Sequence, residues 1–234
     1  AHETQLHAIP DDMPDERAVL VEPLAGGVHA AHVAGAAIEG VDRPIIAVLG
    51  AGTMGLAAVG AVRRYLPDGT RIVVGARYPH QIALAKALGA DEVVQAAKLD
   101  RAVRRMAGCH LIGEGSDAYL SGGAHVTIDA VGTSESITDS LRITRPRGRV
   151  VLLGMPADVK LDLTGLWHRE TELKGVYTYT PDEFAMAVDL ANHYRAERLL
   201  SATYRLDEHA DALALAAAAG RRGAVKIAFD LREK

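Results

Sequence analysis

The chain of 234 residues has room for one large domain, or for one domain and a substantial part of a second. Its hydrophobic content of 49%, with only 4% aromatic residues, predicts a packed α/β core of aliphatic side chains. A net charge of −4 with dispersed basic residues argues against a nucleic-acid surface. No apolar run reaches membrane-spanning length and no secretory signal is present, so we expect a cytoplasmic protein. A single cysteine, Cys109, excludes an intramolecular disulfide and a multi-cysteine metal site.

Short apolar segments alternate with amphipathic segments from residue 45 onward. Strands rich in β-branched residues are expected at 45–49, 71–76, 91–95, 125–132, 149–156 and 172–179. Helices are expected at 53–66, 79–90 and 98–107, with a capped helix and its stop at 134–148 and an irregular glycine-rich loop at 108–124. Apolar strands that alternate with crossover helices predict an α/β fold with a doubly wound parallel sheet of about six strands, the Rossmann arrangement.

The two ends of the chain depart from this alternation. The N-terminal part is expected to hold a strand-like fragment followed by two short helices. The C-terminal part is expected to form, in order, a helix at 181–194, a strand at 201–206, an alanine-rich helix at 207–220 and a strand at 223–230. This C-terminal part carries no nucleotide-binding signature of its own.

The strongest chemical signal is the segment GAGTMG, with Gly50, Gly52 and Gly55 in the G-x-G-x-x-G spacing. It follows a predicted strand and opens a predicted helix, which is the context in which this spacing binds a dinucleotide. Gly50 suits a tight turn, Gly52 lets the backbone approach a pyrophosphate, and Gly55 allows close packing of helix and strand. Thr53 and Met54 begin the helix, whose free N–H groups and positive dipole end attract an anion. The alternative is a glycine-rich turn that binds nothing, and the surrounding pattern favours the nucleotide.

The segment GARYPHQ follows the second predicted strand, where an NAD-binding site places an acid about 20 residues after the glycines. Ala76 stands at that position, with Gly75 before it and Arg77 after it. A 2′-phosphate needs room, no facing carboxylate and a guanidinium, and these residues supply all three. Tyr78 and His80 offer a stacking face or a further donor. The alternative is a solvated surface arginine, but the missing acid favours NADP(H) over NAD(H).

Several segments, in this order, resemble medium-chain, zinc-dependent alcohol dehydrogenases of the sorbitol, threonine and glucose dehydrogenase branch. They are LVEPLAGGVHA, VLGAGTMGL, ALAKALGADEVV, VTIDAVG, LRITRPRGRVVLLGMP, ELKGVYTY and GAVKIAFD. The resemblance covers nearly the whole chain and implies a two-domain enzyme with its active site in the cleft. It implies that residues 1–24 end a substrate-domain segment and its boundary helix, that 25–179 form the NAD(P)-binding domain, and that 180–234 are the C-terminal remnant of the substrate domain.

The departure from the family concerns zinc. Family members carry an N-terminal segment with the ligands of the catalytic zinc, and this sequence lacks that segment. The ten histidines are dispersed without a convincing ligand spacing. The sequence therefore suits a truncated family member or fragment, and zinc is expected only if the missing segment is supplied.

Some site residues follow from the resemblance alone. Glu22 matches a glutamate beside the catalytic zinc, with a simple acid before a helix-starting Pro23 as the alternative. Further implied cofactor contacts are the ribose-lining Val131 and Gly132, the nicotinamide-flanking Gly154 and Met155, and the pyrophosphate-binding Lys226. For Lys226 the alternative is a surface lysine on an edge strand. Asp129 is interpreted as a structural acid at a strand end, and no catalytic role is assigned to Trp167 or His168.

For an intact protein, the resemblance implies hydride transfer between an alcohol or polyol and NADP(H), with zinc as Lewis acid. The implied partners are a small alcohol or carbonyl substrate and a second copy of the chain, because residues 172–179 resemble an edge strand that pairs in family dimers. A dimer or tetramer is expected, without nucleic acid or membrane. Two alternatives stay open, a non-catalytic nucleotide-binding module and a zinc-free reductase of the same superfamily.

Overall fold

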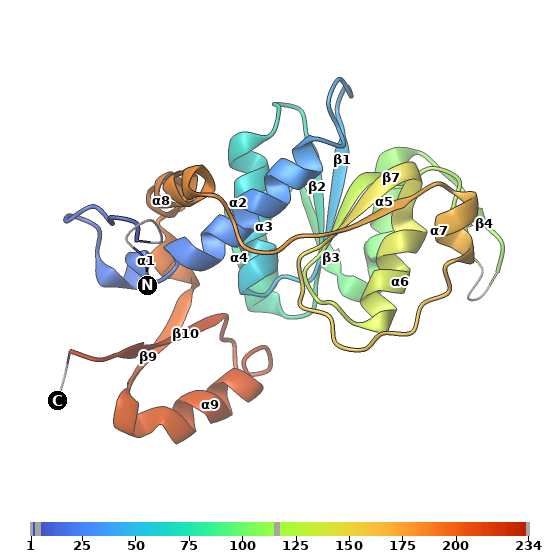
Figure 1. Cartoon of the computed structure of the whole chain (residues 1–234). Helices are drawn as coiled ribbons and strands as arrows, with labels where there is room; N and C mark the ends of the chain where they lie inside the picture. The colour runs from blue at the N-terminus through green and yellow to red at the C-terminus, as the bar shows by residue number, and fades with distance from the viewer. Residues whose placement is uncertain (1, 3–5, 115–117, 233–234) are drawn as a thin grey trace.

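The computed structural model describes residue 2 and residues 6–114 and 118–232. Its main body is a six-stranded parallel sheet in the order β3-β2-β1-β6-β7-β8 (Figure 1). The strands are β1 Ile45–Leu49, β2 Arg71–Ala76, β3 Glu92–Gln95, β6 Ala124–Asp129, β7 Thr144–Leu152 and β8 Glu172–Gly175. This order, with its reversal between β1 and β6, is the doubly wound arrangement that the sequence predicts.

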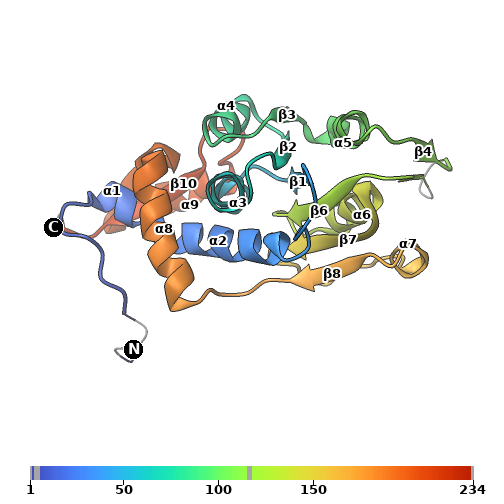
Figure 2. The same cartoon turned by 90° about the horizontal axis from the view of Figure 1, so that it is seen from above.

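Helices cover both faces of the sheet, as Figure 2 shows from above. The helices of the chain are α1 Asp15–Ala18, α2 Val21–Gly35, α3 Thr53–Tyr65, α4 Pro79–Ala87, α5 Leu99–Ala107, α6 Ser134–Ile143, α7 Thr164–His168, α8 Pro181–Tyr194 and α9 His209–Ala217. Because side chains alternate along a strand, Ile46 and Val48 pack toward α2 and α3, whereas Ala47 and Leu49 join the cluster on the α5 side. Strand β1 is therefore apolar and buried throughout.

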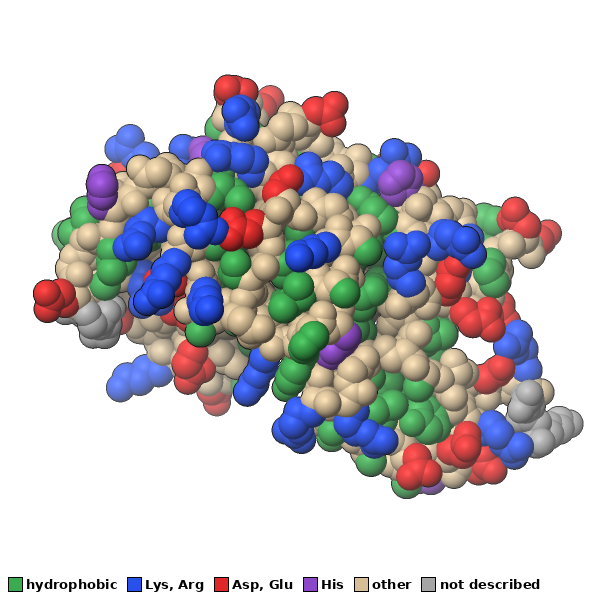
Figure 3. All heavy atoms as spheres, turned by 180° about the vertical axis from the view of Figure 1, so that it is seen from behind, with side chains coloured by type: hydrophobic (Ala, Val, Ile, Leu, Met, Phe, Trp, Pro, Cys, Tyr) green, Lys and Arg blue, Asp and Glu red, His purple; other side chains and the backbone are tan. Residues whose placement is uncertain are grey.

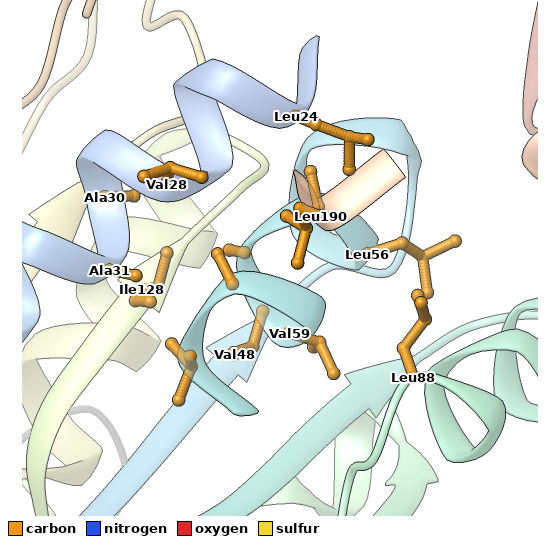
Figure 4. Packing of buried hydrophobic residues seen from close by; sticks show 14 of the residues in the cluster. Leu24, Val28, Ala30, Ala31, Val48, Leu56, Val59, Leu88, Ile128 and Leu190 are labelled. Atoms are coloured by element: carbon orange, nitrogen blue, oxygen red, sulfur yellow. The ribbon is translucent and has the colours of Figure 1, made fainter. Parts of the chain in front are cut away.

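The largest core cluster lies between the sheet and helices α2, α3 and α8 (Figure 4). Leu56 of α3, Val28 of α2 and Leu190 of α8 are all fully buried in it. Helix α2 approaches α3 closely, because a Cβ added at Gly27 would stand 2.6 Å from the carbonyl carbon of Ala57. The glycine in the middle of α2 thus sets the distance between the two helices.

The C-terminal unit, as we name residues 200–230, contains α9 and a two-stranded parallel sheet. The strands are β9 Leu200–Arg205 and β10 Lys226–Asp230, which pair along their length. In Figure 1 the unit lies below the main sheet, on the side where the strands of that sheet end. A third pair, β4 Leu111–Ile112 and β5 Tyr119–Leu120, is antiparallel.

Several expectations about local structure are corrected. The described N-terminal residues form no strand, and of the two helices there only α1 is short, because α2 has 15 residues. The predicted loop at 108–124 contains the β4–β5 pair, whose two-residue strands are too short to leave a pattern. The last predicted strand of the main sheet ends at Gly175, short of residue 179.

Strand β7 begins earlier than expected, directly after α6. The Pro and Gly of the RPRG segment predict a stop, but the chain passes them with a positive φ of 59° at Arg147 and a register shift against β6. A buried hydroxyl pair anchors the start, because Thr144 Oγ1 lies 2.7 Å from Thr127 Oγ1 and donates to the Ser140 carbonyl. None of the described helices is long and apolar enough to cross a membrane.

Candidate functional site

The carboxyl ends of β1, β2 and β6 meet at one edge of the main sheet. Leu49, the last residue of β1, pairs with Gly75 on one side and with Asp129 on the other. The loops that follow these strands therefore converge at this edge. Open α/β sheets bind their ligands at this edge.

The glycine loop leaves β1 through a backbone conformation with φ of +96° at Gly50, which favours glycine. Its N–H donates to the Gly75 carbonyl at 3.0 Å, so the loop is held to β2. Nothing lies within 4 Å of a Cβ built at Gly52, whereas a Cβ at Gly55 would be 1.9 Å from the Gly50 oxygen. The backbone is thus open to a ligand at Gly52 and closed by packing at Gly55.

Helix α3 starts directly after Gly52, which is its N-cap residue. The first N–H groups of a helix have no partner inside it and carry the positive end of the dipole. Leu56 N–H donates to the Gly52 carbonyl at 2.9 Å, which closes the first turn. Thr53 lies in that turn, and the side chain of Met54 reaches back to Gly26 of α2. The start of α3 is therefore a site that suits an anion.

A groove of about 720 Å³ runs along this edge of the sheet. Its walls come from the ends of β1, β2 and β6, from the turn after β3 and from the first turns of α6. Lining residues include Gly50, Gly52, Gly75, Arg77, Tyr78, Gln81, Ala97, Val131, Glu135 and Asp139. The glycine loop and Arg77 thus line the same cavity.

The end of β2 shows how the GARYPHQ segment is arranged. Ala76 is buried in the core, and a Cβ at Gly75 would stand 3.0 Å from Leu99, so both positions also serve packing. Arg77 is exposed and its guanidinium carbon lies 5.7 Å from the centre of the Tyr78 ring. In the part of the chain that the structure describes, this guanidinium has no carboxylate partner.

Gln81, which the sequence analysis did not single out, shapes this turn. Its Oε1 accepts hydrogen bonds from the backbone N–H groups of Arg77 at 3.2 Å and Tyr78 at 3.3 Å. The Tyr78 ring also stacks on His80, with centroids 5.8 Å apart. The turn that presents Arg77 is thus fixed by its own side chains. A glutamine three residues after a helix N-cap is the sequence signal that points to this role.

Acidic side chains line the groove from α6, on the β6 side. Burial raises the pKa of Asp139, an effect that nearby Arg142 opposes. The backbone N–H of Glu135 and the hydroxyl of Thr133 lower the pKa of Glu135. Neither carboxylate follows β2. Among the described lining residues, the cation and the carboxylates therefore come from different walls of the groove.

Two predicted cofactor-contacting loops lie against one another, backbone to backbone. A Cβ at Gly132 would be 2.9 Å from the oxygens of Gly154 and Met155, and one at Gly154 would be 2.5 Å from the carbonyl carbon of Val131. Val131 is 43% exposed and Met155 is 92% exposed, so both side chains are available to a ligand.

Asp129 joins these two loops. Its Oδ1 accepts from the N–H groups of Val131 at 2.8 Å and Gly132 at 3.0 Å, and its backbone oxygen accepts from Leu153 and Gly154. The residue is fully buried. These contacts agree with the interpretation of Asp129 as a structural acid.

The C-terminal unit brings Lys226 to the glycine loop. The hydroxyl of Thr53, the first residue of α3, donates to the carbonyl oxygen of Val225 at 3.2 Å. Lys226 is the next residue and is half-buried. The structure thus places the backbone just before Lys226 against the first residue of α3, although the two segments are far apart in the sequence.

Glu22 lies in the first turn of α2, one turn before Gly26, and it does not line the groove. It is exposed, and the hydroxyl of Tyr179 donates to its Oε1 at 3.5 Å. Among the described residues, no group of three His, Cys, Asp or Glu side chains could hold a metal ion. The residues present therefore do not fit a zinc site.

Trp167 and His168 lie in a different part of the molecule. Trp167 is 79% exposed, and His168 lines a cavity of about 300 Å³ between α6 and α7. Neither side chain lines the groove at the carboxyl ends of the strands.

Comparison with known proteins identifies similar chains. Residues 53–193 match the zinc-binding dehydrogenase family. Sorbitol dehydrogenase from Arabidopsis thaliana is 30% identical over 177 residues, which cover 73% of this chain and 44% of that protein. The chain spans about half the length of the curated relatives it matches.

Solved structures agree with this similarity. L-idonate 5-dehydrogenase from Escherichia coli K-12 superposes with a TM-score of 0.73 at 26% identity, over 95% of this chain and 59% of that one. A structure described as a zinc-binding dehydrogenase from Sinorhizobium meliloti 1021, bound to NADP, gives a TM-score of 0.69 at 25% identity, over 88% of this chain and 57% of that one. The doubly wound fold is therefore shared with known dehydrogenases.

Proposed function

The chain belongs to the zinc-binding dehydrogenase family, and on this premise we propose that it forms the cofactor-binding part of an NADP(H)-dependent alcohol or polyol dehydrogenase. The observation that carries the choice of cofactor is the groove at the strand ends. On its β2 wall it presents the guanidinium of Arg77, which has no carboxylate partner among the described residues, and none of the described lining residues on this wall is acidic. A guanidinium there favours a 2′-phosphate, whereas a ribose 2′-hydroxyl calls for an acid.

In this proposal each part of the cofactor has its own residues. Gly50, Gly52 and Gly55 give the backbone a close approach to the pyrophosphate, and the N–H groups of Thr53 and Met54 with Lys226 balance its charge. On β2, Gly75 and Ala76 leave the strand end without an acid, and Arg77 binds the 2′-phosphate. The ribose and nicotinamide lie along Val131, Gly132, Gly154 and Met155.

The chemistry assigned to this chain is positional. A nicotinamide cofactor, when bound, would supply hydride-transfer chemistry between an alcohol and its carbonyl. The residues of this chain bind and orient the cofactor, and Asp129 holds the two loops that flank it in place. Because the described residues do not form a zinc site, no step of the proposal uses zinc. Glu22 is proposed only as a residue near a metal whose ligands come from outside these 234 residues.

Further parts of the proposal concern organisation. We retain the boundaries 1–24, 25–179 and 180–234 for the substrate segment, the cofactor domain and the second substrate segment. A cytoplasmic homo-oligomer, dimer or tetramer, is also proposed, with β8 as the edge strand available for pairing between copies.

Fluorescence titration with NADPH and NADH tests the proposal. We expect tighter binding of NADPH, and Arg77→Ala should weaken NADPH binding about tenfold or more while changing NADH binding little. Arg104→Ala is the matched control. Arg104 is exposed on α5, near the opposite edge of the sheet, where Arg71 at the start of β2 donates to the Met106 carbonyl.

Each other outcome has a definite meaning. Equal or tighter binding of NADH by the unmodified chain would contradict the NADP(H) preference. The proposal of a dinucleotide site would still hold. Absence of binding for both cofactors, in a chain that melts cooperatively, would contradict the dinucleotide site itself.

A further inference from the structure

The turn that follows α9 rests against Tyr78. A Cβ built on Gly220 would stand 2.1 Å from Cε2 of the Tyr78 ring and 2.8 Å from its Cζ. No side chain larger than hydrogen fits there unless the turn or the ring moves. The C-terminal unit therefore touches the nucleotide groove at Tyr78, one residue after Arg77.

The turn itself is well defined. Arg222 N–H donates to the Ala218 carbonyl at 3.0 Å, and Ala224 N–H donates to the Ala219 carbonyl at 2.8 Å. Gly223 has a φ of +77°, which a left-handed turn residue requires. Hydrogen bonds on both sides of Gly220 thus hold the segment in place.

Two consecutive arginines, Arg221 and Arg222, follow Gly220 in this turn. Both are exposed, and within the described part of the chain neither side chain has a carboxylate or hydrogen-bond partner. The side chain of Arg77 likewise has no carboxylate or hydrogen-bond partner within the described part of the chain. Its guanidinium lies over the ring of Tyr78, which Gly220 also approaches. Figure 3 shows the face of the molecule on which α4 lies, with several Lys and Arg side chains exposed on it. If these side chains come close to one another, their like charges repel unless an anion joins them.

We propose that Arg221 and Arg222 complete the 2′-phosphate site from the C-terminal unit, so that two distant segments recognise this one group. The inference rests on the proposed function. A 2′-phosphate carries nearly two negative charges and three acceptor oxygens. One guanidinium pairs with two of these oxygens, which leaves an acceptor for a second cation. Arg77, directly after β2, supplies the first guanidinium. The turn supplies the second cation from the other side of the Tyr78 ring.

The geometry assigns separate tasks to Tyr78 and Gly220. The ring of Tyr78 keeps the turn at a set distance from Arg77. The absence of a side chain at Gly220 lets the turn come close enough for the arginines to reach the same anion. Arg221 and Arg222 are thus specificity-determining residues for NADP(H) rather than contacts for the rest of the dinucleotide.

The test uses probes that differ in the 2′-phosphate. Adenosine 2′,5′-bisphosphate and adenosine 5′-monophosphate are titrated by calorimetry into the full chain and into the double variant R221A/R222A. We expect the double variant to lose about tenfold in affinity for the bisphosphate and to keep its affinity for the monophosphate. R104A is the control for loss of an exposed arginine.

A second variant tests the contact without changing charge. Gly220→Ala retains both arginines but pushes the turn away from Tyr78, so it should weaken bisphosphate binding in the same direction. Gly165→Ala is its control, because nothing lies within 4 Å of a Cβ at that glycine. Thermal melting of every variant confirms that the chain is folded.

Failure of this inference is distinguishable from failure of the proposed function. If R77A weakens bisphosphate binding and R221A/R222A does not, the role of the turn is overturned and the NADP(H) site stands. If the unmodified chain binds both probes equally, or binds neither, the 2′-phosphate site and this inference are overturned together.

Discussion

The six-stranded sheet and the C-terminal unit are both built from parallel strands, yet they differ in burial. All five residues of β1 are buried, whereas β9 alternates between half-buried and exposed residues. Leu213 on α9 is 63% exposed and Phe229 on β10 is 41% exposed, while Leu56 of α3 is fully buried. Helices on both faces protect the larger sheet from water, and the smaller one lacks this cover. The stability of the molecule therefore resides mainly in the larger sheet.

The same comparison applies to the groove. Gly50 and Gly52 on its floor belong to the loop that follows the well-buried strand β1. The segments that approach from the other side, at Val225 and Gly220, belong to the C-terminal unit. Ligand sites commonly combine a rigid scaffold with a less stable element that closes over it. The difference in burial thus predicts that cofactor binding stabilises the C-terminal unit more than the sheet.

The largest expected effect is in the shared core. Leu56→Ala removes a fully buried side chain that α2 and α8 also contact, and we expect it to lower the free energy of unfolding by about 2–5 kcal/mol. Urea denaturation measures this change. A loss below about 1 kcal/mol would contradict the view that this cluster holds the molecule together.

The next effect concerns the distance between α2 and α3. Gly27→Ala improves helix propensity by about 1 kcal/mol, but its Cβ would collide with Ala57, so we expect a net destabilisation of about 2 kcal/mol. Gly60→Ala on α3 is the matched control. Its nearest neighbour would be 3.4 Å away, an ordinary contact, so this variant should be neutral or more stable. Destabilisation of both variants to the same extent would contradict the steric explanation.

A pH dependence is expected where α8 joins α2. Burial raises the pKa of Glu183, but the Thr180 N–H, His29 and His32 lower it more, to about 2. Its Oε1 lies 3.0 Å from His29 Nδ1 and 2.9 Å from His32 Nδ1. Because the folded pKa is below the unfolded value of 4.5, Glu183 stabilises the fold above that pH, and the contribution is lost as pH falls toward 2.

Unfolding measurements at pH 6 and pH 3 check this sign. The stability difference between the unmodified chain and Glu183→Gln should shrink by about 1–2 kcal/mol on acidification. Glu39→Gln, which replaces an exposed acid, should show no such change. A difference that grows toward low pH would contradict the assignment.

The smallest effect is expected in the C-terminal unit. Leu213→Ala on α9 removes a mostly exposed side chain and should change the free energy of unfolding by no more than about 0.5 kcal/mol. The same urea experiment as for Leu56→Ala provides the measurement. An effect comparable to that of Leu56→Ala would mean that another surface covers Leu213, and the comparison between the two regions would no longer hold.

The sequence by itself determined several regular elements and the glycine turn at the end of β1. Strand β2 and helix α8 have the predicted bounds of 71–76 and 181–194, because apolar period and capping residues such as Thr180 are local properties. The G-x-G-x-x-G spacing likewise specifies a turn between one strand and one helix. Such signals can be read from the sequence because each depends on residues within a few positions of one another.

Only the tertiary structure decided which distant segments meet. The approach of Gly220 to Tyr78, the bond from Thr53 to Val225 and the close passage of Gly27 by α3 leave no local pattern. The position of Ala76 after Gly75 in the sequence does not show that its side chain points into the core. That orientation depends on which face of the sheet α3 covers. These contacts follow from the packing of whole elements, and packing depends on shape across the fold rather than on neighbouring residues along the chain.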